Sequence, residues 1–315
     1  METKIVFIHR GNSWYLPYAL YQAKSASPNS DVVLIGDNLK FKGIHVETLE
    51  NLHGNEIEVF KEHYSHMSTN SEKFELFCWL RWFYLLNYMR KNEVQSVLHL
   101  DSDALLYSSI EDIKKAYAGL DLKCALSIPK QNESTFTWSA SGHISYWTIE
   151  ALENFCGLII DSYRNEKYLN LYKEKWNWHL TQNQPGGICD MTTLYFFWQG
   201  NPDLIVNWAK SHEGNVMDDN INAASNSESD EYLAKNGIKK TKFVNKYPHF
   251  LRADGTGKPD RVHALHLQGS GKQHIRSLYR GKSFKGKTLS EAKHLYNATR
   301  KKIGKLTSIL LDYIF

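Results

Sequence analysis

The sequence contains few cysteines and no long hydrophobic run. Four cysteines are spread over 315 residues without the close spacing of a metal-binding cluster, so we expect reduced, buried thiols of a cytoplasmic protein. They are Cys78, Cys124, Cys156 and Cys189. The apolar run from Ile5 to Ile8 ends at once in His9-Arg10, which makes it too short for a signal peptide. No segment approaches the roughly 18 apolar residues that a membrane span requires.

Internal repeats and an interdomain linker are also absent, so a single α/β domain with insertions is the simplest organisation. An apolar content of 42% and a charged content of 23% are those of a soluble globular protein. From Gly271 onward, eleven basic residues stand against two acidic ones, which gives this tail a net charge of about +9 and leaves about −5 for the rest. The acidic balance of the rest argues against nucleic acid as a partner.

Strand and helix signals alternate along the chain, which indicates an α/β sheet with ligand loops at the strand ends. The helix expected over 72–90 is apolar nearly all round, so it should be buried. The segment 165–190 is rich in Trp, Asn, Lys and Gln and breaks at Pro185, while 215–230 reads as a polar loop. The other predicted strands are 4–8, 31–35, 124–128 and 144–147, and the other predicted helices are 16–24, 150–164 and 191–198.

The most informative stretch is the apolar run that ends in Leu100-Asp101-Ser102-Asp103. It reads as a buried strand whose carboxyl end opens on a site. Two aspartates at i and i+2 on an extended backbone point to the same side, because side chains in a strand repeat with period two. Paired carboxylates suit one hard divalent cation, and a cation held in this way can bind a diphosphate.

Two other interpretations of Asp101 and Asp103 compete. One is a strand end with two solvated acids. The other is a phosphatase of the haloacid-dehalogenase type, in which the first aspartate is the nucleophile, the second an acid/base, and Asp218-Asp219 supply further metal ligands. Ala104 stands where that motif has threonine, and about a hundred residues precede a motif with which such phosphatases usually begin.

A second motif, His266-x-x-Gly269-x-x-Lys272, decides between them. A neutral imidazole is a good ligand for manganese beside two carboxylates. Glycine lets the backbone approach phosphate oxygens closely, and lysine provides a mobile charge for the same phosphates. A histidine near a glycine is by itself more often structural, but its pairing with Asp-x-Asp in one chain favours a site.

Together the two motifs resemble those of the GT-A glycosyltransferases, most closely family 8, the glycogenin and lipooligosaccharide galactosyltransferase type. The resemblance implies a Rossmann-like, mixed but mainly parallel sheet flanked by helices over residues 1–275. It also implies transfer of sugar from a nucleotide donor, a UDP-sugar, with the help of Mn2+ or Mg2+. Asp101, Asp103 and His266 would hold the metal, and Gly269 and Lys272 the diphosphate.

The resemblance extends to other positions of the nucleotide site. The loop with His9, Gly11 and Asn12 lies where the family binds the nucleoside, and Asp37 would accept from the base, although a turn-forming aspartate is an equal alternative. Ser102, between the two metal-binding acids, is assigned to the nucleotide as well.

Arg81 lies in the helix before the Asp-x-Asp strand, where the family has a basic side chain that contacts the donor. Asp190 lies where the family has an acidic side chain near the sugar. The alternative for Arg81 is a buried ion pair with a structural carboxylate, because an arginine in so apolar a run needs an anionic partner. The chain departs from the family at Lys272-Gln273-His274, where Pro-Trp usually follows the lysine, and at Asp190-Met191, where Asp-Gln is common. The segment Ser139 to His143 is a candidate floor beneath the donor sugar.

The family resemblance implies that configuration is retained and that the departing phosphate takes the acceptor proton, whereas an acid of the Asp218-Asp219 loop would serve an inverting enzyme. A catalytically silent sugar- or nucleotide-binding module is the rival from another class. The basic segment 276–315 interleaves lysines with apolar residues and suits an amphipathic helix on an anionic membrane, as for a lipid-linked acceptor in surface-glycan assembly. The plainer alternative is a helix packed on the domain. We expect a cytoplasmic protein, and the amphipathic interpretation of the tail would add a peripheral contact at the inner face of the membrane.

Overall fold

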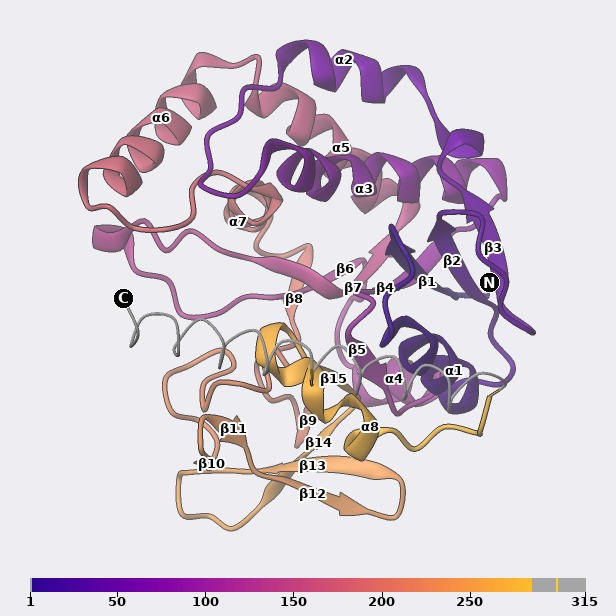
Figure 1. Cartoon of the computed structure of the whole chain (residues 1–315). Helices are drawn as coiled ribbons and strands as arrows, with labels where there is room; N and C mark the ends of the chain where they lie inside the picture. The colour runs from indigo at the N-terminus through magenta and orange to yellow at the C-terminus, as the bar shows by residue number, and fades with distance from the viewer. Residues whose placement is uncertain (1, 285–298, 300–315) are drawn as a thin grey trace, which may run out of the picture.

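The computed structural model of the chain describes residues 2–284 and Thr299 (Figure 1). Within this part, a seven-stranded sheet has the order β3-β2-β1-β4-β7-β6-β8. Only β7 runs antiparallel to its neighbours, so the sheet is mixed but mainly parallel, as the sequence predicts. Its strands are β1 (Lys4–His9), β2 (Val32–Gly36), β3 (His45–Thr48), β4 (Ser96–Leu100), β6 (Cys124–Ser127), β7 (Ser141–Thr148) and β8 (Ile205–Asn207).

Both faces of this sheet are apolar, because alternate residues of each strand supply two separate cores. Val6 and Ile8 of β1 pack on one side, whereas Ile5 and Phe7 pack on the other. Helices therefore cover both faces, as Figure 1 shows. On one face lie α2 (Asn55–His63), α3 (Glu72–Lys91), α5 (Ile149–Ser162), α6 (Glu166–Thr181) and α7 (Asp190–Gly200); on the other lie α1 (Leu16–Ala26) and α4 (Ile110–Ala116).

A second, smaller sheet with the order β12-β13-β14-β9 lies beyond α1 and α4 at the lower end of the molecule in Figure 1. A short antiparallel pair, β15 (Ala264–His266) with β5 (Ala104–Leu106), joins the chain after this sheet to the chain just after β4. The remaining elements are β9 (Asn215–Val216), β10 (Ala234–Lys235), β11 (Ile238–Lys239), β12 (Thr241–Val244), β13 (Tyr247–Leu251), β14 (Pro259–Val262), α8 (Ile275–Leu278) and the 3-10 turns η1 (Glu50–Leu52), η2 (Glu133–Thr135) and η3 (Gly269–His274).

Most elements expected from the sequence are present, but α6 lies within the stretch 165–190, for which the sequence predicts no helix. Its side chains give only a weak apolar pattern, and Tyr172 and Lys175 are its buried residues. The side chain of Asn165 accepts from the N–H of Lys167 and caps the helix start. The strands β10 to β14 were not predicted either.

Residues 275–284 pack back on the domain. Ile275 and Tyr279 belong to the third apolar core, and the N–H of Arg280 donates to Gln22 Oε1 of α1. The rest of the basic tail, for which an amphipathic helix is expected, lies outside the described residues. No helix in the described part has the length and apolar character needed to cross a membrane.

Candidate active site

Asp101 and Asp103 follow β4 at the carboxyl end of the parallel strands. The backbone turns here, since the N–H of Ala104 donates to the carbonyl of Asp101 (2.9 Å), and β5 begins at Ala104. The expectation of an extended backbone is therefore wrong, because β5 leaves the sheet to pair with β15. The turn still brings both carboxylates to one site.

His266 joins the two aspartates because the β15–β5 pair places it opposite Ala104. One ligand atom from each of Asp101, Asp103 and His266 lies within 4.8 Å of the other two. Two carboxylates and an imidazole on neighbouring backbone segments are a donor set that suits Mn2+ or Mg2+. Among the described residues, this is the only cluster of three such side chains that could hold a metal ion.

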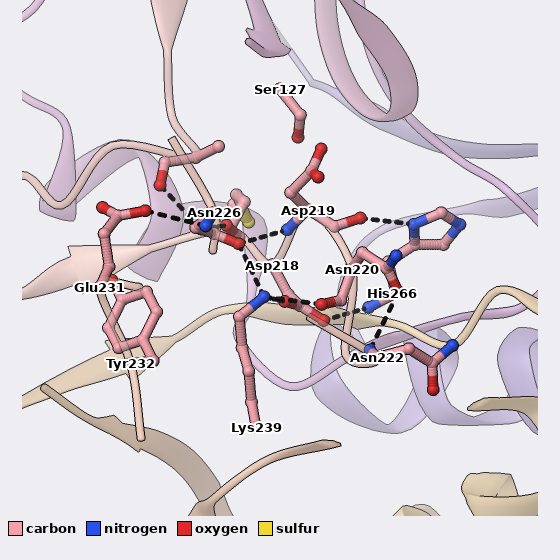
Figure 2. A network of polar contacts seen from close by, with 12 residues as sticks. Ser127, Asp218, Asp219, Asn220, Asn222, Asn226, Glu231, Tyr232, Lys239 and His266 are labelled. Carbon is pink, nitrogen blue, oxygen red and sulfur yellow. Dashed lines mark hydrogen bonds and ion pairs between the residues drawn. The ribbon is translucent and has the colours of Figure 1, made fainter. Parts of the chain in front are cut away.

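His266 is held by hydrogen bonds of its ring and of its backbone to the Asp218-Asp219 loop (Figure 2) and by a ring stacked on its face. Its Nδ1 donates to the carbonyl oxygen of Asp219 (2.7 Å), which leaves Nε2 directed at Asp103 Oδ1 (3.6 Å). Its backbone N–H donates to Asp218 Oδ2 (3.0 Å), and His143 stacks on its face with ring centroids 3.9 Å apart. A fixed Nδ1–H with a free Nε2 is the arrangement that a metal-binding histidine needs. The donor set and its orientation fit a divalent cation.

A buried ion pair supports this arrangement. Lys239 and Asp218 have fully buried side chains, and Lys239 Nζ lies 2.7 Å from Asp218 Oδ1. The same Nζ donates to the carbonyl of Asn220 (2.7 Å) and to Asn226 Oδ1 (3.1 Å), so all three of its hydrogens have acceptors (Figure 2). Asp218 thus holds the backbone of His266 while Lys239 compensates its buried charge. Because both oxygens of the Asp218 carboxylate already have partners, Asp218 cannot serve as the further metal ligand that the phosphatase interpretation needs.

Charges within the cluster are strongly coupled. Burial lowers the pKa of His266, but the close contact with the Asp103 carboxylate and the charge of Asp101 outweigh it and raise that pKa to about 9. Burial also opposes ionisation of Asp103, but its contacts with His266 and Lys272 hold its pKa well below the usual range. In the metal-free protein, a cationic His266 thus provides a positive charge beside the two aspartates, in addition to the charge of Lys272.

This coupling predicts a pH-dependent stability of the metal-free protein. The folded-state pKa of His266, about 9, lies above its ordinary value of 6.5. Its contribution to the free energy of unfolding is therefore fully present below about pH 6.5 and lost as the pH rises through about 9. We expect the urea midpoint in the presence of a chelator to fall more between about pH 6 and about pH 10 for the wild type than for His266→Gln. Parallel pH profiles of the two proteins would contradict the assignment.

Arg81 bridges the metal cluster to Asp190. Its guanidinium contacts Asp101 Oδ1 (3.0 Å) and Asp190 Oδ2 (2.7 Å), and Trp82 Nε1 donates to the same Asp190 oxygen (2.9 Å). Arg81 therefore forms a buried ion pair, but its partners are residues of the site itself and not structural carboxylates, and its contact with the donor stays a prediction. Asp190, 3% exposed at the start of α7, lies in the same cavity as Asp101.

Lys272 and Gly269 lie beside Asp103 on η3. Lys272 Nζ is 2.5 Å from Asp103 Oδ2, so the lysine reaches the cluster as its spacing predicts. Gly269 has φ +54°, a left-handed conformation in which side chains are strained, and space is open where a Cβ would lie. Both residues line the cavity of about 720 Å³ that contains Asp101, Asp103, Asp190 and His266.

The predicted nucleoside residues divide between two cavities. His9 lines the metal-site cavity, and its Nδ1 lies 2.9 Å from Ser102 Oγ. Asp37 lines an adjoining cavity of about 870 Å³ and accepts from the N–H of Gly11 (2.7 Å), a contact that joins the loops after β1 and β2. Asn12 is exposed and lines neither cavity.

Arg10 and Phe77 line both cavities and so lie between them, with the guanidinium 5.7 Å from the ring centroid. Arg10 belongs to the loop 9–12 that the resemblance places at the nucleoside, although it was not named as a site residue, and Phe77 was predicted only as a buried residue of its helix. Arg10 directly follows the predicted first strand, and this position at a strand end could have identified it as a residue of the site. Lys239 was missed because it lies in a stretch without helix or strand periodicity.

Comparisons with known proteins give structural neighbours only. No protein-family model matches the sequence, and no curated protein matches it. The structure is similar to mouse xyloside xylosyltransferase 1, with a TM-score of 0.47 and 10% identity over 65% of this chain and 84% of that one. It is also similar to an active-site mutant of LgtC (TM-score 0.45, 16% identity, 88% and 95%) and to a glycosyltransferase involved in glycosylation of the PBCV-1 major capsid (0.42, 10%, 88% and 100%). All three are glycosyltransferases.

Proposed function

We propose that the protein is a metal-dependent glycosyltransferase that moves a sugar from a nucleotide donor, a UDP-sugar, to a saccharide or glycolipid acceptor. The observation that carries the proposal is the meeting of Asp101, Asp103 and His266 within 4.8 Å, with Lys272 beside them in one cavity. Three metal ligands and a lysine form a site for a cation and a diphosphate together. A cavity of about 720 Å³ is large enough for a small ligand and its charged groups.

The side chains have separate roles in this proposal. Asp101, Asp103 and His266 would hold Mn2+ or Mg2+, which when bound supplies positive charge for the departing diphosphate. Lys272 exchanges its contact with Asp103 for the same phosphates. Arg81 holds Asp190 in place, and Asp190 uses its second oxygen for a sugar hydroxyl.

We further propose that configuration at the anomeric carbon is retained. The bond from that carbon to the diphosphate oxygen breaks, the bond to the acceptor oxygen forms on the same face, and the acceptor proton passes to the departing diphosphate. Asp190 suits a binding role better than that of a base, because Arg81 and Trp82 both donate to its Oδ2 and hold the carboxylate in place.

The phosphatase alternative is disfavoured by two contacts. Ala104, at the place of the expected threonine, is fully buried in the ladder opposite His266. Asp101, the required nucleophile, accepts from Arg81. A catalytically silent binding module would have the same contacts in its site as an enzyme. Only a measurement of turnover therefore distinguishes the two.

We propose a cytoplasmic location, with the basic C-terminal tail at the inner face of the membrane and a role in surface-glycan assembly. The tail's basic and apolar composition supports the membrane contact, and the four dispersed cysteines support the cytoplasmic location. Sedimentation with vesicles that contain anionic lipid, compared for the full chain and for a chain ending at residue 284, tests this part separately.

A thermal-shift screen tests the donor class. Each nucleotide and nucleotide sugar is added with and without Mn2+, and we expect a UDP-sugar to raise the melting temperature only when the metal is present, because the diphosphate is bound through it. Release of UDP over time then distinguishes an enzyme from a binding module. A flat response to every nucleotide, with phosphate or a phosphorylated sugar stabilising instead, would overturn the proposal.

A further inference from the structure

A second cavity, of about 380 Å³, adjoins the metal-site cavity on the side of Asp190. The two cavities share part of their lining: Asn70, Glu75, Ser139, Cys189 and Met191. Two of these residues flank Asp190 in the chain. A ligand in the second cavity would therefore lie next to the sugar of a donor bound at the metal site, which is where an acceptor has to be.

Aromatic rings form one wall of the second cavity. Phe136, Trp138 and Trp178 line it, and the Phe136 centroid lies 4.9 Å from that of Trp138 and 5.9 Å from that of Trp178. Phe136 has φ +47°, a left-handed conformation that is uncommon for a bulky residue and is found at constrained functional sites. Such rings stack well on the apolar faces of sugars.

Lys175 of α6 is the buried cation of this cavity. Its residue is 6% exposed, and its Nζ donates to Thr192 Oγ1 (3.0 Å) and to the carbonyl of Trp138 (3.4 Å). Both acceptors are neutral, and no carboxylate of the described residues pairs with Lys175. Lys239 shows the contrast, since its equally buried ammonium is compensated by Asp218.

An ammonium buried without a counter-ion is costly, and burial lowers the pKa of Lys175. Two of its three hydrogens have acceptors, so one remains for a ligand. An anionic group of a ligand in the cavity would supply the missing charge.

We propose that the second cavity binds the acceptor, that this acceptor is an acidic saccharide, and that Lys175 recognises its carboxylate or phosphate group. The proposal rests on the proposed function and gives it a substrate class. Stacking on the aromatic wall orients the sugar ring, and the charge of Lys175 selects acidic rings over neutral ones.

Glu75 fixes the direction in which such an acceptor lies. Its Oε1 accepts from Ser68 Oγ (3.0 Å) and Asn70 Nδ2 (2.7 Å), whereas its Oε2 is buried without a partner. Glu75 lines both cavities, so carboxyl oxygens that accept hydrogen bonds stand at their junction and suit hydroxyl groups better than an anion. The acidic group of the acceptor therefore lies at the Lys175 end, and hydroxyl groups face Glu75 and the donor.

The test uses three small probes and two variants of the full chain. Methyl glucuronide, glucose 6-phosphate and methyl glucoside are titrated by ligand-observed NMR, with and without UDP and the diamagnetic Mg2+. Lys175→Met removes the charge and keeps the length, and Lys173→Met, an exposed lysine of the same helix, is the matched control. UDP binding in the presence of Mn2+ is measured in parallel for each protein.

We expect at least one acidic probe to bind the wild type about tenfold more tightly than methyl glucoside, because hydrogen bonds between charged groups are stronger. Lys175→Met should equalise the probes without changing UDP binding, and Lys173→Met should behave as the wild type. Which acidic probe is preferred tells a carboxylate from a phosphate acceptor.

Equal binding of acidic and neutral probes to the wild type overturns the proposal, even if Lys175→Met fails to fold. So does a preference that survives in Lys175→Met, or binding of none of the probes. If the wild type does not bind UDP, the proposed function is contradicted instead. The preference of the cavity for acidic probes is measured without the nucleotide as well, so the two results are independent.

Discussion

Asp103→Asn is expected to reduce metal-dependent release of UDP from the donor by on the order of 1,000-fold. The substitution keeps the shape of the side chain but removes the charge that faces both His266 and Lys272. It leaves the described cluster with one carboxylate, Asp101, which already contacts Arg81. Turnover measured over a range of Mn2+ concentrations should show both a lower maximum and a higher metal requirement.

Asp121→Asn is the matched control, because Asp121 is exposed and pairs only with Lys123 at the surface among the described residues. It should retain wild-type turnover. If Asp103→Asn keeps full metal-dependent activity, the metal site is elsewhere. If the wild type binds UDP with Mn2+ but releases none from any UDP-sugar, the chain is a binding module.

Lys239→Met should destabilise the protein by about 3–5 kcal/mol, because it leaves the Asp218 carboxylate buried without its cation. Asp218 also holds the backbone of His266 and, through its carbonyl (3.2 Å), His143 Nε2. The variant should therefore bind Mn2+ about 10- to 100-fold more weakly even at temperatures where it is folded. Urea unfolding and a metal titration measure the two effects.

The double variant with Asp218→Asn separates charge from packing. Replacing both charged partners removes the uncompensated carboxylate while the asparagine still accepts from His266, so most of the stability should return. Lys240→Met, at the exposed neighbouring position, should have little effect on either measurement. A single Lys239→Met variant as stable as the Lys240→Met control would show that Asp218 is compensated in another way.

The sequence predicts those parts of the fold that depend on local pattern. Strand β1 and helix α3 appear at their expected positions because their apolar residues follow the periods of a strand and of a buried helix. The meeting of Asp103 with His266 was expected as well, but from the resemblance of two motifs and not from any local pattern. The turn after Asp101 was not foreseen, because it depends on β15 as a partner distant in sequence.

The sequence does not predict the role of a side chain when that role depends on residues distant in the chain. Lys239 and Lys175 look alike in the sequence, yet one is neutralised by Asp218 and the other faces neutral acceptors. Helix α6 itself was missed because its buried residues form no continuous stripe. Charge compensation is decided by tertiary contacts, which one sequence does not display.

The β15–β5 pair also determines when the site comes into existence during synthesis. Asp101 and Asp103 leave the ribosome early, with the first half of the sheet, whereas His266 follows only after the small sheet with β12 to β14. A nascent chain that stops before residue 264 has the sheet's first strands and both carboxylates but lacks the imidazole. The proposed cation site is thus completed only when nearly the whole described chain has been made, and a truncated translation product would have two of its three ligands.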